Sequence, residues 1–548
     1  GAPSQPQLRH LRSRGLGDAA LHESSEQDAS DIQVWPLPAK WSSGSSTLLV
    51  RPSAEFFASK SAAPALLAAF KRYGRLCFPH SVGAGGDGDA PAITGLDVEV
   101  EDDSMGVPQI GLDEAYTLSI HADGGRAVVR AKTLLGALHG LETFSQLVVF
   151  GFAAGAYEVR GAPWEIEDKP RFPHRGLMVD TSRHFLPLAA LYGIIDSLPY
   201  AKLNVLHWHV SDEQSFPLQS KTFPRLWDGA YSPQERYTQE DVADVVAYAA
   251  ARGIRVLPEF DMPGHAASWC AGYPEICPSA QCKQPLNVAA NATWSVIEGL
   301  LEEVTGGRRS EPGKPSGLWP DNFLHLGGDE VDTACWVQTP SISLWLAQHS
   351  MTPTQAYGHF TKRAAEIAIS KGRRPVQWSE VFDAFRDELP KETVVHIWKG
   401  NTKVSDVVSL GYDVILNVGY NEQSWYLDNL GVRWDAVYAK EPCEGIPSDD
   451  LCSKVLGGHG QMWGETVDAS DLQQTVWPRL AAIAERLWSP RAQTADAAAA
   501  RPRIQRFRCL LMERGVAAAP VDADGRAAPS GPGACGYAPE DLSSEAVA

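Results

Sequence analysis

The sequence lacks any apolar run that approaches the ~18 residues needed to cross a bilayer. It also lacks an excess of positive charge, because 67 Asp and Glu residues outnumber 48 Lys and Arg residues and leave a net charge of -19. Proteins that bind nucleic acids need clustered Lys and Arg side chains to contact phosphates. We therefore expect no membrane span and no nucleic-acid partner.

The N-terminus lacks the charged and then apolar segment of a secretory signal, and residue 1 is a glycine. We expect this of a chain from which a signal peptide has been removed or omitted, so the compartment must be inferred from other residues. Residues 1–31 are rich in Ser, Gln, Asp and Arg and show no period. This composition predicts a flexible N-terminal lead.

Cysteines are present in places that favour disulfide bonds. Several of the nine lie in polar segments rich in Pro and Gly, which suits disulfides formed in an oxidising compartment. We predict that Cys443 pairs with Cys452 and that Cys509 pairs with Cys535. The odd number leaves one free thiol, which we assign to Cys77. The alternative interpretation is that all nine are reduced residues of the core.

The remaining cysteines leave their pairing open. We expect Cys335 to form a bridge with one of Cys270, Cys277 and Cys282, and spacing alone does not select among the three. Asn291 begins the sequon Asn-Ala-Thr, which makes it a candidate glycosylation site and agrees with a secretory route.

The order of patterns along the chain predicts two folded domains. Residues 32–165 mix short alternating strands with an amphipathic helix at 133–148, which indicates a small α+β domain without a cluster of catalytic residue types. Residues 166–500 alternate apolar runs with helix-length segments, which is typical of α/β folds. A C-terminal helix and a disulfide-tied tail are expected over residues 501–548. The small domain is expected to support the larger one by packing against it.

Eight apolar runs in the larger domain match the eight parallel strands of a (β/α)8 TIM barrel. The runs lie at 175–180, 204–212, 254–261, 323–330, 375–380, 394–399, 413–418 and 455–464. Pro199 is expected to break the helix predicted over 188–202, because proline removes a helix hydrogen bond. The connection over 419–454 is expected to be a long ordered loop without a helix.

The residues that follow these runs are the kinds that a sugar site needs. A barrel builds its active site from the loops after its strands. Indole rings pack on the apolar faces of pyranoses, while carboxylates and guanidinium groups bond their hydroxyls. The acids, bases and aromatic residues in these positions include Arg183, Asp212, His265, Asp329, Glu330, Trp378, Trp398, Tyr426, Asp428, Trp463 and Glu465. Together they predict a carbohydrate site at the mouth of the barrel.

Asp329 and Glu330 follow two glycines at the end of the fourth run. In the usual retaining glycosidase, an acid and a nucleophile bracket the anomeric carbon at about 5 to 5.5 Å from each other. Sequence neighbours at a strand end tend to point apart, so this pair is poorly placed to play both roles. Some other group must therefore attack the sugar. A plain solvated turn is the alternative interpretation of the two acids.

Five segments resemble the family-20 glycoside hydrolases, the β-N-acetylhexosaminidases of the eukaryotic lysosomal and secreted type. The segments are 172–176, 180–184, 207–209, 259–265 and 325–332, and the resemblance extends over about residues 34–535. It implies a substrate-assisted mechanism, in which the 2-acetamido carbonyl attacks its own anomeric carbon and forms an oxazolinium intermediate. Such intramolecular attack contributes roughly 7 to 11 kcal/mol to lowering the barrier.

The resemblance assigns the catalytic roles. Glu330 would be the general acid and then the base that activates water, while Asp329 would orient the acetamido group and stabilise its positive charge. Tyr426 would donate to the acetamido carbonyl oxygen. We expect the adjacent carboxylate of Asp329 to raise the pKa of Glu330 and keep it protonated.

The resemblance also assigns the binding residues. Trp378, Trp398 and Trp463 would wall the pocket. Asp212 and His265 would form a polar relay behind Glu330, although a buried and simply satisfied His–Asp pair is the alternative. The ring hydroxyls would be held by Arg183, Asp428 and Glu465.

The family implies no cofactor, no metal, GlcNAc- or GalNAc-terminated glycans as partners, a homodimer, and a lysosomal, vacuolar or secreted location. The segment that carries Asp428 and Asn429 offers no positive charge, which favours neutral terminal sugars over sulfated or sialylated ones. Residues 306–317 are rich in Gly, Pro and basic residues and are expected to form an inserted surface loop. Cys77 has no evident partner in the leading domain, where the family has a bridge.

Two other functions are compatible with parts of this pattern. His207 and His209 share one face of a strand, and with His265 and Asp212 they could bind zinc in a metal-dependent barrel hydrolase. The second rival is a glycan-binding protein on a hydrolase fold that has lost its activity.

Overall fold

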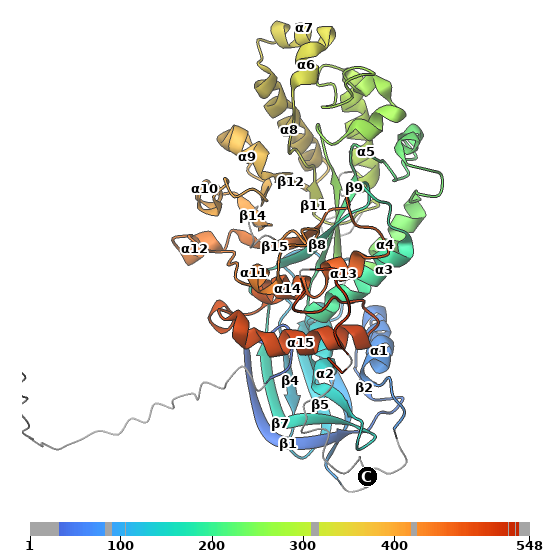
Figure 1. The fold of residues 1–548 in the computed structure, drawn as a ribbon, viewed down its shortest axis with the longest axis vertical. Helices are drawn as coiled ribbons and strands as arrows, with labels where there is room; N and C mark the ends of the chain where they lie inside the picture. The colour runs from blue at the N-terminus through green and yellow to red at the C-terminus, as the bar shows by residue number, and fades with distance from the viewer. Residues whose placement is uncertain are drawn as a thin grey trace, which may run out of the picture.

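The computed structural model describes residues 32–82, 90–104, 106–307, 317–417, 425–523, 525–531 and 533–535. The predicted lead at 1–31 and most of the predicted insertion at 306–317 lie outside the described residues. Figure 1 shows the N-terminal sheet at one end of the molecule and the barrel at the other, with α15 (Ala497–Glu513) between them. Arg514, directly after α15, forms an ion pair with Glu142 of the N-terminal domain at 2.8 Å.

The N-terminal domain is a seven-stranded sheet covered by two helices. Its strands follow the order β1-β3-β5-β4-β7-β6, and β2 pairs with β3. Helix α2 matches the predicted helix, and Thr133 begins it by accepting from the backbone N–H of Gly136. The elements are β1 Lys40–Val50, β2 Phe57–Ala58, α1 Pro64–Cys77, β3 Ala92–Asp102, β4 Tyr116–Ile120, β5 Gly125–Thr133, α2 Leu134–Leu147, β6 Val148–Gly151 and β7 Ala156–Asp168.

A buried polar contact joins this domain to the barrel. Trp488 packs in the apolar core of the N-terminal domain and donates its indole N–H to Asp168. Lys202 of the barrel also lies 2.9 Å from Asp168, with both side chains fully buried. Because a charge buried without its partner is strongly destabilising, these pairs fix how the small domain sits against the barrel.

Eight parallel strands close into the barrel that the sequence predicts. Each strand pairs with its neighbours in the chain, and β15 pairs with β8 to complete the ring. The expected (β/α)8 architecture is therefore confirmed. The strands are β8 His174–Asp180, β9 Val205–Ser211, β10 Arg255–Phe260, β11 Phe323–His325, β12 Arg374–Trp378, β13 Val394–Ile397, β14 Asp413–Leu416 and β15 Val455–Met462.

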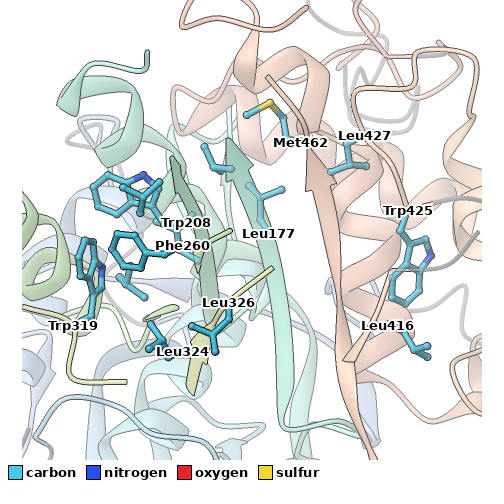
Figure 2. Close-up of a cluster of buried hydrophobic side chains, with 14 of the residues drawn as sticks. Leu177, Trp208, Phe260, Trp319, Leu324, Leu326, Leu416, Trp425, Leu427 and Met462 are labelled. Carbon is cyan, nitrogen blue, oxygen red and sulfur yellow. The ribbon is translucent and has the colours of Figure 1, made fainter. Parts of the chain in front are cut away.

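Strand β9 shows how alternation divides the core from the barrel interior. Trp208 points outward and packs edge-on against Trp319, 6.0 Å between ring centroids, in the apolar layer of Figure 2. The neighbouring His207 and His209 face the opposite side of the strand, toward the interior. Both are fully buried and lie within 2.8 Å of the carboxylate of Glu259.

The barrel interior is layered. Six apolar side chains form one cluster inside the barrel, namely Val205, Leu257, Phe323, Val376, Val394 and Ile415. A second layer is made of histidines from alternate strands, which is how barrel layers are built. Its members are His207, His325, His396 and His459. The ring centroids of His207 and His325 lie 4.7 Å apart, and those of His396 and His459 lie 5.0 Å apart.

The helices lie outside the barrel. Helix α3 ends at Ser197 and a 3-10 turn follows over Leu198–Ala201, so Pro199 breaks the helix as predicted. The connection between β14 and β15 differs from the expected loop, because it contains two short helices, α11 and α12. The helices are α3 Leu188–Ser197, α4 Gln239–Ala250, α5 Asn291–Thr305, α6 Ala334–Gln338, α7 Pro340–Gln348, α8 Pro353–Ser370, α9 Ser379–Phe385, α10 Val404–Ser409, α11 Trp434–Tyr438, α12 Asp449–Cys452, α13 Leu472–Val476, α14 Arg479–Trp488 and α15.

Four disulfides are formed. Two of them are the predicted bridges Cys443–Cys452 and Cys509–Cys535. Within the group whose pairing was open, Cys335 pairs with Cys282, and Cys270 pairs with Cys277. Cys77 is buried and free, as expected. In the part of the chain that the structure describes, none of the helices has the length and apolar character needed to span a bilayer.

Candidate active site

A pocket of about 520 Å³ opens at the carboxyl ends of the barrel strands. This is the size range of small-molecule sites. Nearly all the candidate site residues meet here, although they come from seven different strand ends. The lining comprises Arg183, His265, Asp329, Glu330, Trp378, Trp398, Tyr426, Asp428, Asn429, Trp463, Glu465 and Thr466. Asp212, the remaining candidate, is fully buried beneath Arg183 and His265.

The turn that carries the two central acids requires glycine. Strand β11 ends at His325, earlier than the predicted run, and the backbone then turns through Gly327 (φ 64°) and Gly328 (φ 100°). A Cβ at Gly327 would lie 1.7 Å from Oδ1 of Asp261. The backbone N–H of Gly328 donates to the same oxygen at 2.8 Å. Glycine therefore lets the turn approach Asp261 closely enough to be held by it.

Asp329 and Glu330 occupy different environments. The side chain of Asp329 is 8% exposed, whereas that of Glu330 is 51% exposed. Glu330 has a left-handed backbone (φ 50°), a conformation that residues other than glycine rarely adopt. It directs the carboxylate of Glu330 into the open pocket while Asp329 stays at the pocket floor. The two acids are therefore available for different tasks.

The prediction that Asp329 raises the pKa of Glu330 is wrong in the free protein. The pKa of Glu330 is lowered, chiefly because the ring N–H of His265 faces its carboxylate. His265 Nε2 lies 3.6 Å from Glu330 Oε2 and 3.7 Å from Asp329 Oδ2. Asp329 turns to the buried side, whereas His265 faces both acids. The attraction of His265 therefore lowers the pKa of Glu330 more than the repulsion of Asp329 raises it.

His265 belongs to a chain of alternating acids and bases. Its Nδ1 donates to Asp212 at 3.0 Å, and Asp212 accepts from His209 at 2.8 Å through its other oxygen. Burial lowers the pKa of His265, but the carboxylates of Asp329, Asp212 and Glu330 more than offset this and raise it well above its usual value. The pKa of Asp212 is held well below its usual value by hydrogen bonds from His209 and His265 despite its burial. The expected contact between Asp212 and His265 is thus present.

Arg183 is fixed by three carboxylates. It contacts Asp180 at 2.9 Å and Asp212 at 2.8 Å, and Glu465 lies 3.7 Å away. Its guanidinium also stacks over the indole of Trp463 at 5.0 Å. A fork held in this way presents its remaining N–H groups in a fixed direction, which suits recognition of a sugar hydroxyl.

The segment after β14 alternates between core and pocket. Trp425 and Leu427 pack into the apolar core, as Figure 2 shows, while Tyr426 and Asp428 line the pocket. The backbone N–H of Leu427 donates to the carbonyl of Gln461 on β15 at 2.6 Å, which anchors the segment. Burial, together with the nearby charge of Glu465, raises the pKa of Asp428 to about 6.

Three indoles wall the pocket, and two of them donate to acids, the buried Glu259 and the partly buried Glu380. Trp378 donates its N–H to Glu259 at 2.9 Å and lies 6.1 Å from Trp463, centroid to centroid. Trp398 donates to Glu380 at 2.7 Å. Glu380 also pairs with Lys399 at 2.6 Å, and the Lys399 ammonium sits 4.3 Å from the ring of Trp398.

Sequence reasoning gave no role to several residues that support the site. Asp261 is one of them, since burial and the charge of Asp329 raise its pKa well above the usual value. In its neutral form it can donate a hydrogen bond to Asp329. Glu259 and Glu380 are the others, because they hold two indoles of the wall. Glu259 and Asp261 lie in the segment 259–265, whose many polar residues near a strand end were the available signal.

The residues proposed for a zinc site do not form one. His209 is bonded on both nitrogens, to Glu259 at 2.8 Å and to Asp212 at 2.8 Å. The carboxylates around it raise its pKa well above the usual value despite burial. Because a metal ligand needs a free lone pair, His209, which is bonded on both nitrogens, does not offer one in this arrangement.

Comparison with known proteins gives a consistent match over most of the chain. A family model described as glycosyl hydrolase family 20, catalytic domain, matches residues 172–491, and one described as beta-acetyl hexosaminidase like matches residues 34–147. Beta-hexosaminidase 1 of Arabidopsis thaliana is 44% identical over 524 residues, which cover 92% of this chain and 94% of that protein.

A more distant relative and a solved structure agree with this match. Beta-hexosaminidase subunit beta of Sus scrofa is 35% identical over 517 residues, covering 90% of this chain and 93% of that protein. The solved structure of a Flavobacterium johnsoniae chitobiase superposes with a TM-score of 0.77 at 28% identity, covering 90% of this chain and 74% of that one.

Proposed function

This chain belongs to glycosyl hydrolase family 20 and is a β-N-acetylhexosaminidase, and we propose that it removes terminal, non-reducing GlcNAc or GalNAc by substrate-assisted catalysis. The observation that carries the mechanism is the contrast between the buried carboxylate of Asp329 and the exposed carboxylate of Glu330 in one pocket. An exposed acid can reach the leaving oxygen, whereas a buried one can hold a neutral group that becomes positive. The substrate's acetamido carbonyl then supplies the nucleophile.

Asp329 is proposed to orient the acetamido group and to stabilise the charge on its nitrogen. Asp261 supports this role, because its raised pKa favours the neutral form, which can donate a hydrogen bond to Asp329. Tyr426, Trp378 and Trp463 also line the pocket, and we propose that Tyr426 donates to the carbonyl oxygen while the two indoles close the space around the acetamido group. Fixed groups aimed at developing charge are the largest contributors to many rate enhancements.

Glu330 is proposed as the general acid and then as the base. Its pKa is lowered in the free protein, so it must gain its proton as the sugar binds. A bound sugar removes water from a side chain that is 51% exposed, and this desolvation favours the neutral form. After the first step the same carboxylate accepts a proton from the attacking water.

The hydroxyl-binding groups support a neutral terminal sugar. Arg183, Asp428, Glu465 and Trp463 are proposed to bind the ring. The basic residues among the described pocket lining are Arg183 and His265, and both are already paired with carboxylates. Asn429 adds no charge, so a sulfate or sialate would have no unpaired cation to meet in this lining.

Hydrolysis of an aryl N-acetylglucosaminide tests the activity. We expect turnover that is inhibited by a thiazoline mimic of the oxazolinium, and we expect Glu330→Gln to reduce it strongly when the aryl leaving group needs a proton. A protein that binds GlcNAc without hydrolysing the aryl glycoside would instead be a glycan-binding protein. Loss of activity to chelators, together with one zinc per chain, would favour a metal hydrolase.

A substrate panel tests the proposed specificity. Terminal GlcNAc, GalNAc and sulfated GlcNAc are compared from about pH 4 to pH 7, the range over which carboxylates in such sites titrate. We expect comparable rates on the first two and little turnover of the third. A preference for the sulfated sugar would contradict our assignment of Asp428 and Asn429.

Four disulfides support an oxidising compartment, and we propose a lysosomal, vacuolar or secreted location. Asn291 is exposed at the first turn of α5, which is compatible with glycosylation. A homodimer is proposed by the family resemblance, and light scattering after size exclusion tests it. That nucleic acids do not bind stays a prediction from the net charge.

A further inference from the structure

Glu259 lies at the end of β10 and touches no open space in the pocket. Its side chain is fully buried, yet each of its carboxylate oxygens accepts a hydrogen bond from a different part of the active site. Oε1 accepts from the indole N–H of Trp378 at 2.9 Å. Oε2 accepts from Nδ1 of His209 at 2.8 Å. One carboxylate therefore joins a wall of the pocket to the interior of the barrel.

The His209 arm continues to the proposed general acid. His209 donates through Nε2 to Asp212 at 2.8 Å, and His265 donates to the other oxygen of Asp212 at 3.0 Å. His265 Nε2 in turn faces Glu330 at 3.6 Å. Acids and bases alternate at every step from Glu259 to Glu330, so each of the three inner members, His209, Asp212 and His265, has a partner of the opposite type on both sides.

The surroundings of Glu259 keep it charged and in place. His207 lies 2.8 Å from Oε2 and His325 lies 3.2 Å from Oε1. The charges and hydrogen bonds of these histidines and His209 hold the pKa of Glu259 well below its usual value, although burial opposes this. A buried carboxylate that accepts from several donors cannot move without leaving one of them unsatisfied.

We propose that Glu259 is a positioning residue, which holds the Trp378 wall and the His209–Asp212–His265 chain behind Glu330 in one fixed geometry. This inference rests on the proposed function, because it assigns Trp378 to the acetamido pocket and Glu330 to proton transfer. It adds two residues, Glu259 and His209, to the groups that set up the reaction. Neither of them touches the substrate.

Glu259→Gln is the sharpest probe, because glutamine has nearly the same shape but only one acceptor oxygen. Its amide nitrogen must face either the indole N–H of Trp378 or the N–H of His209, and two donors repel each other. His209→Gln separates the two arms, since it interrupts the chain toward Glu330 and leaves the acceptor for Trp378 in place. Glu114→Gln is the matched control, as it removes another buried, ion-paired glutamate far from the pocket.

Two readouts distinguish positioning from general damage to the fold. Affinity for the thiazoline mimic reports the acetamido pocket, and the dependence of kcat/KM on the leaving group reports proton delivery by Glu330. We expect Glu259→Gln to weaken thiazoline binding about tenfold, the effect of one lost hydrogen bond to a charged group. We also expect its kcat/KM to fall further on a chitobiose-type substrate than on a dinitrophenyl glycoside.

The three variants should differ in thiazoline affinity and in leaving-group dependence. His209→Gln is expected to show the steeper leaving-group dependence with thiazoline affinity within about twofold of the wild type, since only the acid arm is cut. Glu114→Gln is expected to lose stability and to change neither readout. Should Glu259→Gln behave like Glu114→Gln, or should it fail to fold while His209→Gln keeps the wild-type leaving-group dependence, the inference is overturned. A wild type that does not hydrolyse the aryl glycoside would overturn the proposed function instead.

Discussion

Asp329 and Glu330 are adjacent in the chain, but the first side chain is 8% exposed and the second is 51% exposed. This difference separates their proposed tasks, because only Glu330 reaches the open pocket where a leaving group departs. His265 faces both carboxylates, at 3.7 Å and 3.6 Å. The same histidine thus acts on both carboxylates, although one is proposed to contact the acetamido group and the other the leaving oxygen.

Glu330→Gln is expected to reduce kcat by about 10² to 10⁴ on substrates with poor leaving groups, the usual contribution of a general acid. The loss should be smaller on a dinitrophenyl glycoside, whose leaving group needs no proton. Steady-state kinetics on the two substrates measures the difference. The melting temperature should stay close to that of the wild type, because the side chain is half exposed. Equal losses on both substrates would contradict the assignment.

Asp329→Asn is expected to lower kcat by about 10² to 10³, the effect of removing one group that stabilises transition-state charge. The affinity for the thiazoline mimic should fall as well, because the ring nitrogen of that compound occupies the place of the oxazolinium nitrogen that Asp329 is proposed to contact. Titration of the inhibitor measures this directly. Tyr426→Phe is the companion variant and should also weaken the inhibitor. An Asp329→Asn protein with wild-type inhibitor affinity would remove Asp329 from the acetamido pocket.

Asp428→Asn should show a pH-dependent defect. Since the pKa of Asp428 is raised to about 6, the group is largely neutral at lower pH, where asparagine resembles it. The ratio of wild-type to variant kcat/KM should therefore be near one at pH 4.5 and should grow to about tenfold above pH 6, where the ionised acceptor is lost. A ratio that does not change with pH would show that the charge of Asp428 plays no part.

Asp428→Asn should be more stable than the wild type at neutral pH, although it is expected to be less active there. A carboxyl whose pKa is raised by folding destabilises the native state as pH rises above the unfolded pKa, near 4, and the effect is complete above 6. Asp428→Asn is expected to gain about 3 kcal/mol in the free energy of unfolding at pH 7 and less than about 1 kcal/mol at pH 4. Urea unfolding at the two pH values measures it.

Asp212→Asn should destabilise the protein and slow the reaction. It would leave Arg183, His209 and His265 without their shared buried anion, and breaking a buried pair in this way costs about 3–5 kcal/mol. Glu465→Gln is the control, since its side chain is 55% exposed and 3.7 Å from Arg183. An exposed pair contributes less than about 1 kcal/mol. Similar unfolding free energies for the two variants would contradict this prediction.

Removal of the Cys282–Cys335 bridge should be more harmful than removal of Cys443–Cys452. The first spans 53 residues and the second 9, and a longer loop restricts the unfolded chain more. The difference in the free energy of unfolding between the two double Ala variants should be about 1–2 kcal/mol. Urea unfolding of both variants measures it, and a larger loss for the short loop would show that native-state contacts dominate.

Much of the architecture follows from local patterns. The apolar runs predicted β8 to β15 because buried parallel strands are continuous and bounded by turn residues, and the broken helix at Pro199 follows from a missing N–H. The two short helices between β14 and β15 escaped prediction, because four- and five-residue helices have no periodicity to detect. The residues placed in the pocket were those with chemically distinctive side chains after each strand.

The sequence by itself determined the kinds of groups available, namely two adjacent acids after a glycine turn and indoles at successive strand ends. Only the tertiary structure decided their electrostatic state and their supports. The sequence suggested that the pKa of Glu330 is raised by Asp329. It is lowered, because the fold brings His265 from the loop after another strand to 3.6 Å from the Glu330 carboxylate. Glu259 and Asp261 gained their importance in the same way, since closing a barrel joins side chains that are far apart in the chain.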